Sequence, residues 1–167
     1  MKKDNKLIVI IIIAAIIIAF GIVLGINYNT WFGKKDIEPQ KVEKSMDENA
    51  GDYVEEEVEN YNGANVILPG WTELHIEANT KEITKGIDFY NPSGNNGYYY
   101  LTFQLKINNE VLYESGLVAP GKHIQKITLK RALKEGVYDA TIFMQPYKWD
   151  KATPTNNANV RIKLVVG

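Results

Sequence analysis

An unbroken apolar run occupies residues 7–26, where fifteen of the twenty positions are Ile, Leu, Val or Phe and the others are Ala or Gly. A helix rises about 1.5 Å per residue, so this run would reach about 30 Å, which is the hydrocarbon thickness of a bilayer. A helix on the surface of a soluble domain keeps a polar face, and this run has none. The pattern predicts one transmembrane helix over residues 7–26.

Three lysines in residues 1–6 predict that this short tail is cytoplasmic and that the chain beyond the span is extracellular. Lys34 and Lys35 on the far side reduce the charge contrast. The alternative is a cleavable signal peptide, whose apolar region usually runs 7–15 residues and ends in small residues. Here the run is longer and ends in Val-Leu-Gly at residues 23–25. We therefore predict an uncleaved signal anchor in a single-pass protein of the cell membrane.

Residues 27–60 are predicted to form a juxtamembrane and acidic linker. Between residues 33 and 60 there are ten acidic side chains and four lysines, with few apolar residues among them. Such a composition buries too little apolar surface to offset the entropy lost on ordering. We expect a flexible stalk that anionic headgroups repel, and a simple soluble spacer is the alternative.

From residue 61 the pattern changes to short alternating runs separated by Gly, Asn and Pro, which is typical of β-strands. The clearest run covers residues 99–107, where every second residue is a large apolar or aromatic one. Asn108-Asn109 predicts a hairpin turn, and Ala119-Pro120-Gly121-Lys122 predicts a second turn. The other predicted strands lie at residues 74–78, 83–90, 111–113, 124–129, 138–144 and 160–166.

About seven short strands without a helical period predict an all-β domain over residues 61–167, an immunoglobulin-like antiparallel β-sandwich. Residues 133–140 read LKEGVYDA, which places Tyr138 after a glycine turn and two residues before the small Ala140. This arrangement is typical of the tyrosine corner of such sandwiches. We expect the Tyr138 hydroxyl to be buried and to bond the backbone near Leu133.

Four phrases bear on origin: LPGW at residues 68–71, DFYNP at 88–92 with Tyr98-Tyr99 after it, VAPGK at 118–122 and TPTNNA at 153–158. With these phrases the chain resembles a family of small single-span extracytoplasmic proteins of low-GC Gram-positive bacteria, often carried on mobile or conjugative elements. The resemblance covers the anchor and most of residues 66–166. It implies the location and the immunoglobulin-like fold, and it brings no catalytic residues with it.

The chain offers little catalytic chemistry. It has no cysteine, which excludes disulfides, thiol nucleophiles and thiolate metal sites. Its two histidines, His75 and His123, are predicted to lie on the surface. Motifs of the HExxH, GxSxG, phosphate-loop and calcium-loop types are missing from the sequence. We expect a protein that is not an enzyme and that uses no metal or cofactor.

Charge also argues against nucleic acid as a partner. Residues 61–167 carry twelve basic and nine acidic side chains, a net charge of +3, and the two signs are interleaved along the chain. A protein that follows a phosphate backbone concentrates its lysines and arginines on one face. We therefore expect no nucleic-acid partner.

Aromatic residues are the strongest functional signal. Tyr98, Tyr99 and Tyr100 cannot all face inward, because side chains alternate along a strand. A further tryptophan, Trp149, falls in the polar stretch 148–158, where no core pattern explains it. Exposed Tyr and Trp anchor protein interfaces and stack on sugar rings. The predicted interaction surface consists of Tyr98, Tyr100, Tyr147 and Trp149.

These observations predict a membrane-anchored, non-enzymatic, extracytoplasmic protein-interaction module of the bacterial cell envelope. Its contact with the membrane is residues 7–26, and its expected partner is another envelope protein. A cell-wall or carbohydrate-binding module is the alternative, since aromatic rings also stack on sugars. A third alternative is an accessory protein or inhibitor that acts on an enzyme at the cell surface.

Overall fold

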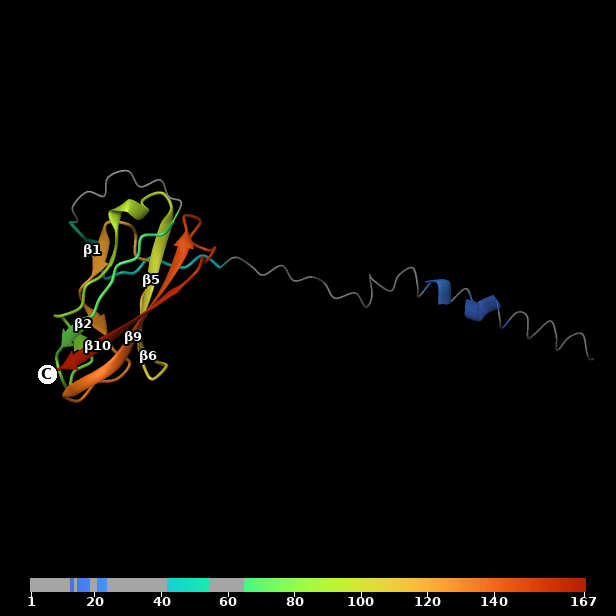
Figure 1. Cartoon of the computed structure of the whole chain (residues 1–167). Helices are drawn as coiled ribbons and strands as arrows, with labels where there is room; N and C mark the ends of the chain where they lie inside the picture. The colour runs from blue at the N-terminus through green and yellow to red at the C-terminus, as the bar shows by residue number, and fades with distance from the viewer. Residues whose placement is uncertain (1–12, 14, 19–20, 24–41, 55–64) are drawn as a thin grey trace, which may run out of the picture. The chain divides into compact units, whose positions relative to one another are not determined.

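The computed structural model describes residues 13, 15–18, 21–23, 42–54 and 65–167 (Figure 1). Residues 1–40 and 41–167 form two separate units, and each is considered by itself. The predicted tail 1–6 lies outside the described residues, as do most positions of the predicted span 7–26. Those described within the span are helical. Within the described part of the chain, no helix is long and apolar enough to cross a membrane.

The second unit is a mostly β unit, as predicted: apart from one short 3-10 helix, the regular elements of its described residues are all strands. The strands are β1 (Ala50–Asp52), β2 (Glu73–Ile76), β3 (Glu82–Ile83), β4 (Phe89–Asn91), β5 (Tyr99–Ile107), β6 (Glu110–Glu114), β7 (Lys122–Ile124), β8 (Ile127–Thr128), β9 (Gly136–Lys148) and β10 (Ala158–Val166). A short 3-10 helix, η1 (Ser93–Asn95), precedes β5.

The largest sheet has the order β2-β10-β9-β5-β6, with β2 parallel to β10 and the other pairs antiparallel. Strand β5 pairs with β9 along its whole length, from Tyr99 opposite Lys148 to Ile107 opposite Ala140. The predicted hairpin after β5 is confirmed: Asn108 and Asn109 have φ values of 49° and 67°. Positive φ at both central residues is the geometry that joins twisted antiparallel strands with a two-residue loop.

Two smaller sheets, β1-β7-β4 and β3-β8, complete the strand set among the described residues. Each of the predicted strands 83–90 and 124–129 is divided into two shorter strands. Five residues separate Ile83 from Phe89, whereas only two separate their pairing partners Ile127 and Ile124, so the pairing is interrupted. Gly86 lies in this break with φ 79°, and a Cβ there would be 1.5 Å from the carbonyl oxygen of His75. A position so close to another backbone admits only glycine, and the sequence pattern did not reveal it.

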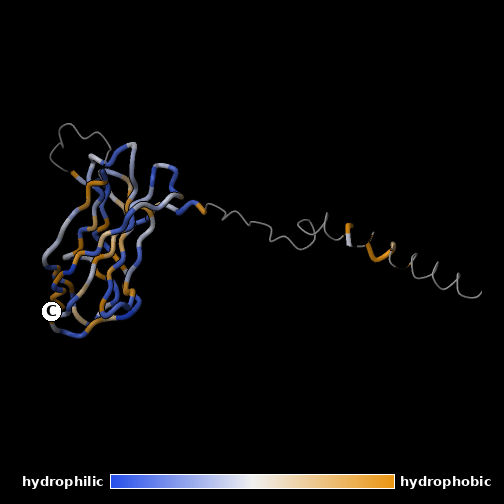
Figure 2. Tube along the Cα trace, turned by 45° about the vertical axis from the view of Figure 1, so that its right-hand side comes forward, coloured by the Kyte–Doolittle hydropathy of each residue, from blue (hydrophilic) through white to orange (hydrophobic). Residues whose placement is uncertain are grey.

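The large sheet faces the smaller sheets across one hydrophobic core. Phe103 of β5 and Phe89 of β4 are fully buried, and their rings stack with centroids 5.4 Å apart. Buried side chains from β2, β9 and β10 join the same cluster, and apolar and polar positions alternate along the strands (Figure 2). The buried alternation of Leu101, Leu105 and Ile107 confirms the predicted inward face of β5. The result is a layered all-β fold.

The predicted turn at residues 119–122 and the predicted backbone hydrogen bond of Tyr138 are both present. The amide of Lys122 donates to the carbonyl of Ala119 at 3.1 Å, and Gly121 has φ 70°, so residues 119–122 form the predicted turn. The Tyr138 hydroxyl donates to the carbonyl of Lys134 at 2.9 Å, one residue from the predicted Leu133. The Tyr138 side chain is half-buried rather than buried.

Residues 42–54 depart from the expected flexible linker 27–60. We call them the strap, because they lie along the β domain and supply β1, which pairs antiparallel with β7 (Figure 1). Contacts with the β domain therefore begin before residue 61. The sequence prediction rested on the low apolar content of this segment, whereas the strap is held mainly by backbone hydrogen bonds, which composition does not report.

Candidate interaction surface

The register of β5 against β9 brings the four predicted aromatic residues to one end of the large sheet. Tyr100 lies directly opposite Tyr147 on the neighbouring strand. Tyr98 immediately precedes β5, and Trp149 immediately follows β9. We call Tyr98, Tyr100, Tyr147 and Trp149 the aromatic surface.

Trp149 is the central residue of this surface. Its ring stacks on Tyr100 with centroids 4.6 Å apart and planes at 19°, while 44% of Trp149 remains exposed. Tyr100 is only 7% exposed, so its predicted exposure was wrong: Trp149 covers it. Tyr98 is 42% exposed and Tyr147 is half-buried. Tyr98 and Trp149 are thus the members most open to a partner.

The loop that carries Trp149 is held by its own hydrogen bonds. The Asp150 carboxylate accepts from the amides of Ala152 at 3.0 Å and Thr153 at 2.8 Å, and from the Thr153 hydroxyl at 2.5 Å. The Lys148 amide donates to the carbonyl of Thr153 at 2.9 Å. A loop fixed in this way loses little conformational entropy on binding, which favours affinity.

Two lysines face the aromatic rings. The Lys151 ammonium lies 5.7 Å from the centroid of Tyr100, and the Lys44 ammonium lies 5.4 Å from that of Tyr147. Lys44 also lies 3.7 Å from a carboxylate oxygen of Glu114. Both ammonium groups are close enough for a cation–π attraction. Rings bordered by cations favour a partner with acidic groups at its contact.

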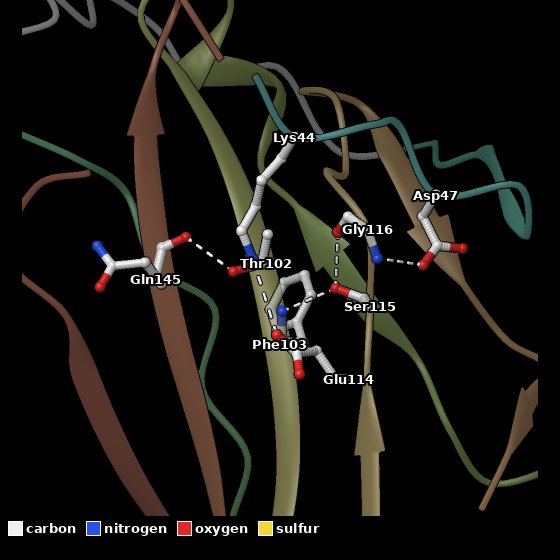
Figure 3. Close-up of polar contacts among 8 residues, drawn as sticks. All are labelled: Lys44, Asp47, Thr102, Phe103, Glu114, Ser115, Gly116 and Gln145. Atoms are coloured by element: carbon white, nitrogen blue, oxygen red, sulfur yellow. Dashed lines mark hydrogen bonds and ion pairs between the residues drawn. The ribbon is translucent and has the colours of Figure 1, made fainter. Parts of the chain in front are cut away.

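The strap reaches the aromatic surface through Lys44, whose amide donates to the carbonyl of Lys151 at 3.1 Å. Its next contacts are with the β6–β7 connection. Leu117 donates to the carbonyl of Ser45 at 2.9 Å and accepts from the amide of Asp47 at 2.8 Å. The Gly116 amide donates to the Asp47 carboxylate at 2.7 Å (Figure 3).

The other end of the strap lies against β4 and β7. The Tyr53 amide donates to the carbonyl of Gly121 at 2.8 Å, and the Tyr53 ring stacks on Tyr90 with centroids 4.5 Å apart. An ion pair joins Asp52 to Lys122. This bond with Lys122 holds the pKa of the Asp52 carboxyl below its usual value.

His123 differs from the predicted surface histidine. Its side chain is 17% exposed, its Nδ1 lies 2.8 Å from the Asp88 carboxylate, and its ring contacts Tyr53. His75 is confirmed as a surface residue and pairs with Glu73.

In the described part of the chain no three His, Asp or Glu side chains come together as metal ligands would. An open depression of about 250 Å³ borders His123, Gly51 and Lys126.

A buried pair of asparagines next to Tyr98 was not predicted from the sequence. Asn91 and Asn95 are fully buried, and the side-chain amide of Asn95 donates to the side-chain oxygen of Asn91 at 2.7 Å. Asn95 also exchanges two hydrogen bonds with the backbone of Ile67. The backbone carbonyl of Asn95 accepts from the Tyr98 amide at 3.0 Å. The turn-rich run 91–97 was the available signal, but a turn prediction does not distinguish a buried asparagine from an exposed one.

Burial of Tyr113, and secondarily the nearby Asp47 carboxylate, raise the pKa of its phenol well above the ordinary value of 10.0. The folded protein therefore holds this proton more tightly than the unfolded chain does. The resulting stability is complete below pH 10 and is lost as the pH rises above it. We expect the free energy of unfolding to lose up to about 1.4 kcal/mol per pH unit from this group.

Tyr113→Phe should remove that part of the alkaline destabilisation. Urea unfolding of the natural protein and the variant between pH 8 and pH 11.5 measures it. We expect the free energies of unfolding of the two proteins to lie within about 1 kcal/mol of each other at pH 8. Plotted against pH, the two curves should converge or cross above pH 10. Curves that stay parallel would contradict the assignment.

No protein-family model matches the chain, and neither a curated protein nor a solved structure matches it. The resemblance to the envelope proteins of Gram-positive bacteria stays a prediction.

Proposed function

We propose that this chain is a membrane-anchored, non-enzymatic interaction module on the outside of a bacterial cell, which binds another envelope protein through the aromatic surface. The observation that carries the proposal is the exposed ring of Trp149, held on Tyr100 and on a hydrogen-bonded loop. Large aromatic side chains in fixed positions are typical hot spots of protein interfaces.

Membrane attachment is supported by the apolar run 7–26. Within it, Ile16, Ile17 and Ile18 are helical and each is more than 60% exposed. Consecutive residues of a helix point about 100° apart, so these three cover most of its circumference with apolar surface. A helix that is apolar all round favours a lipid environment.

An immunoglobulin-like topology is supported by the strand order. Strands β5, β9 and β10 are neighbours in the order of strands C, F and G of that fold, and β4 and β7 pair as strands B and E do. Tyr138 lies near the start of β9 and bonds four residues back, as the tyrosine of strand F does. The ends of such sandwiches commonly carry the binding loops, and the 148–155 loop lies at one end.

The second candidate is a cell-wall or carbohydrate-binding module. It is favoured by the same tryptophan, because a ring that uses one face to stack on Tyr100 leaves its other face for a sugar. The flanking lysines Lys44 and Lys151 favour an acidic protein partner over a neutral glycan.

Photo-cross-linking in living cells tests the proposal. A photoreactive residue at position 149 of the full chain should give a discrete protein adduct, and one at position 137 should not. Val137 is the matched control, because it is 66% exposed at the opposite end of β9. Trp149→Ala should weaken binding of the captured partner by about 30-fold, the loss of a hot spot of about 2 kcal/mol, while Val137→Ala leaves it unchanged.

Equal adducts from positions 149 and 137, or none from either, would refute the aromatic surface as a protein interface. If no protein is captured and the purified chain sediments with cell wall in a Trp149-dependent way, the carbohydrate alternative replaces the proposal.

A further inference from the structure

We infer that the strap occupies a peptide-binding groove, and that an extended segment of a protein partner with a carboxylate and an aromatic ring six residues later binds there in its place. The groove runs along residues 116–118 and the edge of β7 that β1 covers, and it ends at the ring of Tyr90. The residues that line it are not those of the aromatic surface proposed above, although the strap also places Lys44 beside Tyr147.

The first end of the groove recognises a carboxylate. The Asp47 carboxylate accepts from the Gly116 amide at 2.7 Å (Figure 3). It also lies 3.4 Å from the Tyr113 hydroxyl. Ser115 fixes this amide, since its hydroxyl donates to the Gly116 carbonyl and accepts from the Phe103 amide, both at 2.8 Å. An oriented N–H and O–H are the donors that a carboxylate ligand requires.

Gly116 also sets how closely a ligand backbone can approach. A Cβ on this residue would lie 2.8 Å from the Asp47 nitrogen and 2.9 Å from its Cα. Neither atom belongs to a flexible side-chain end, so an alanine here forces the bound segment away. The groove is therefore shaped for a peptide backbone passing directly over Gly116.

The second end recognises an aromatic ring. Tyr53 stacks on Tyr90, and His123 lies beside it with ring centroids 5.4 Å apart. Between the two ends, β1 adds an antiparallel strand to β7. Backbone pairing at a sheet edge with side-chain pockets on either side is the mode by which many domains bind extended peptides.

The strap can leave without dismantling the core. In the described part of the chain, all buried residues of the core cluster lie between residues 74 and 166. Ala50 is the one strap residue that packs against them. Val42, Met46 and Val54 are 76%, 39% and 95% exposed. The strap itself therefore buries little apolar side-chain area. Its release leaves one edge of β7 unpaired, which favours replacement by another strand.

A labelled peptide of residues 42–54 is the probe. We expect it to bind the full chain weakly, because the resident strap competes, and about 10-fold more tightly to the full-chain variant Asp47→Ala/Tyr53→Ala, whose strap is weakened. A peptide with Asp47→Ala should bind that variant at least about 10-fold more weakly than the natural peptide. Fluorescence anisotropy measures all three.

Adding Gly116→Ala to the strap variant should abolish peptide binding, while adding Gly70→Ala should not, because nothing lies within 4 Å of a Cβ at Gly70. The comparison of the two peptides uses an unaltered groove, so it decides the matter even if Gly116→Ala fails to fold. Equal affinity for the natural chain and the strap variant, equal affinity of the two peptides, or no binding at all would overturn the inference. The cross-linking result at position 149 does not depend on any of these.

Discussion

Phe103→Ala should lower the free energy of unfolding by about 3–5 kcal/mol, the usual cost of removing a fully buried phenylalanine. Phe103 is 0% exposed and stacks on Phe89 across the two layers. The rings of Phe103 and Trp71 are nearly perpendicular, with centroids 6.1 Å apart. It lies on β5, which pairs with both β6 and β9. The cavity would open where the large sheet meets the smaller ones, so the packing of both layers is affected.

Phe143→Ala is the matched control, because the same atoms are removed from a half-buried residue on the other face of the sheet. Its ring contacts the Lys106 ammonium at 4.2 Å and does not belong to the buried core cluster. We expect it to cost about 1 kcal/mol. Urea unfolding of the three proteins gives the comparison. Similar losses for the two variants would show that Phe103 does not join the layers.

Local patterns were sufficient to predict much of the β fold. The alternation of residues 99–107 gave both the length of β5 and its inward face, since side chains alternate strictly along a strand. Asn108-Asn109 predicted its hairpin, because asparagine tolerates positive φ. These features depend on neighbouring residues, so they can be inferred without knowledge of the rest of the chain.

Contacts between distant residues could not be predicted in the same way. The sequence pattern predicted that Tyr100 and Trp149 are each exposed on the surface. In the structure the two rings stack, so that Tyr100 is buried and Trp149 is held in position. His123 was expected to be a solvated residue, and its partner Asp88 is 35 positions away. Burial of a polar residue depends on which strands become neighbours, and alternation alone does not specify the neighbours.

The strap shows the same limitation for composition. Acidic residues and low apolar content predicted a flexible segment, and the prediction took no account of an available sheet edge. Three residues of β1 pair with β7, and the Asp47 carboxylate accepts a hydrogen bond from the Gly116 amide, 69 positions away in the sequence. Backbone donors and acceptors are present in every sequence, so only the structure reveals that this edge binds a segment of the same chain.

The second large effect is expected from Asn91→Leu, which should lower the free energy of unfolding by about 2–4 kcal/mol. Asn91 is fully buried, and its side-chain amide donates to the carbonyls of Val118 at 2.9 Å and Tyr99 at 3.1 Å. Leucine has a similar size but makes none of these bonds. Each buried polar group left without its partner costs about 1–3 kcal/mol, and some of the groups keep other partners.

The consequence of Asn91→Leu should extend to the aromatic surface. Asn95 loses its bond to Asn91, and Asn95 in turn holds the backbone of Tyr98. We therefore expect Asn91→Leu to weaken cross-linking from position 98 even at temperatures where the domain remains folded. Asn159→Leu, a change at an exposed position of β10, should alter neither stability beyond about 0.5 kcal/mol nor cross-linking. If the two variants behave alike, the buried asparagines do not position the aromatic surface.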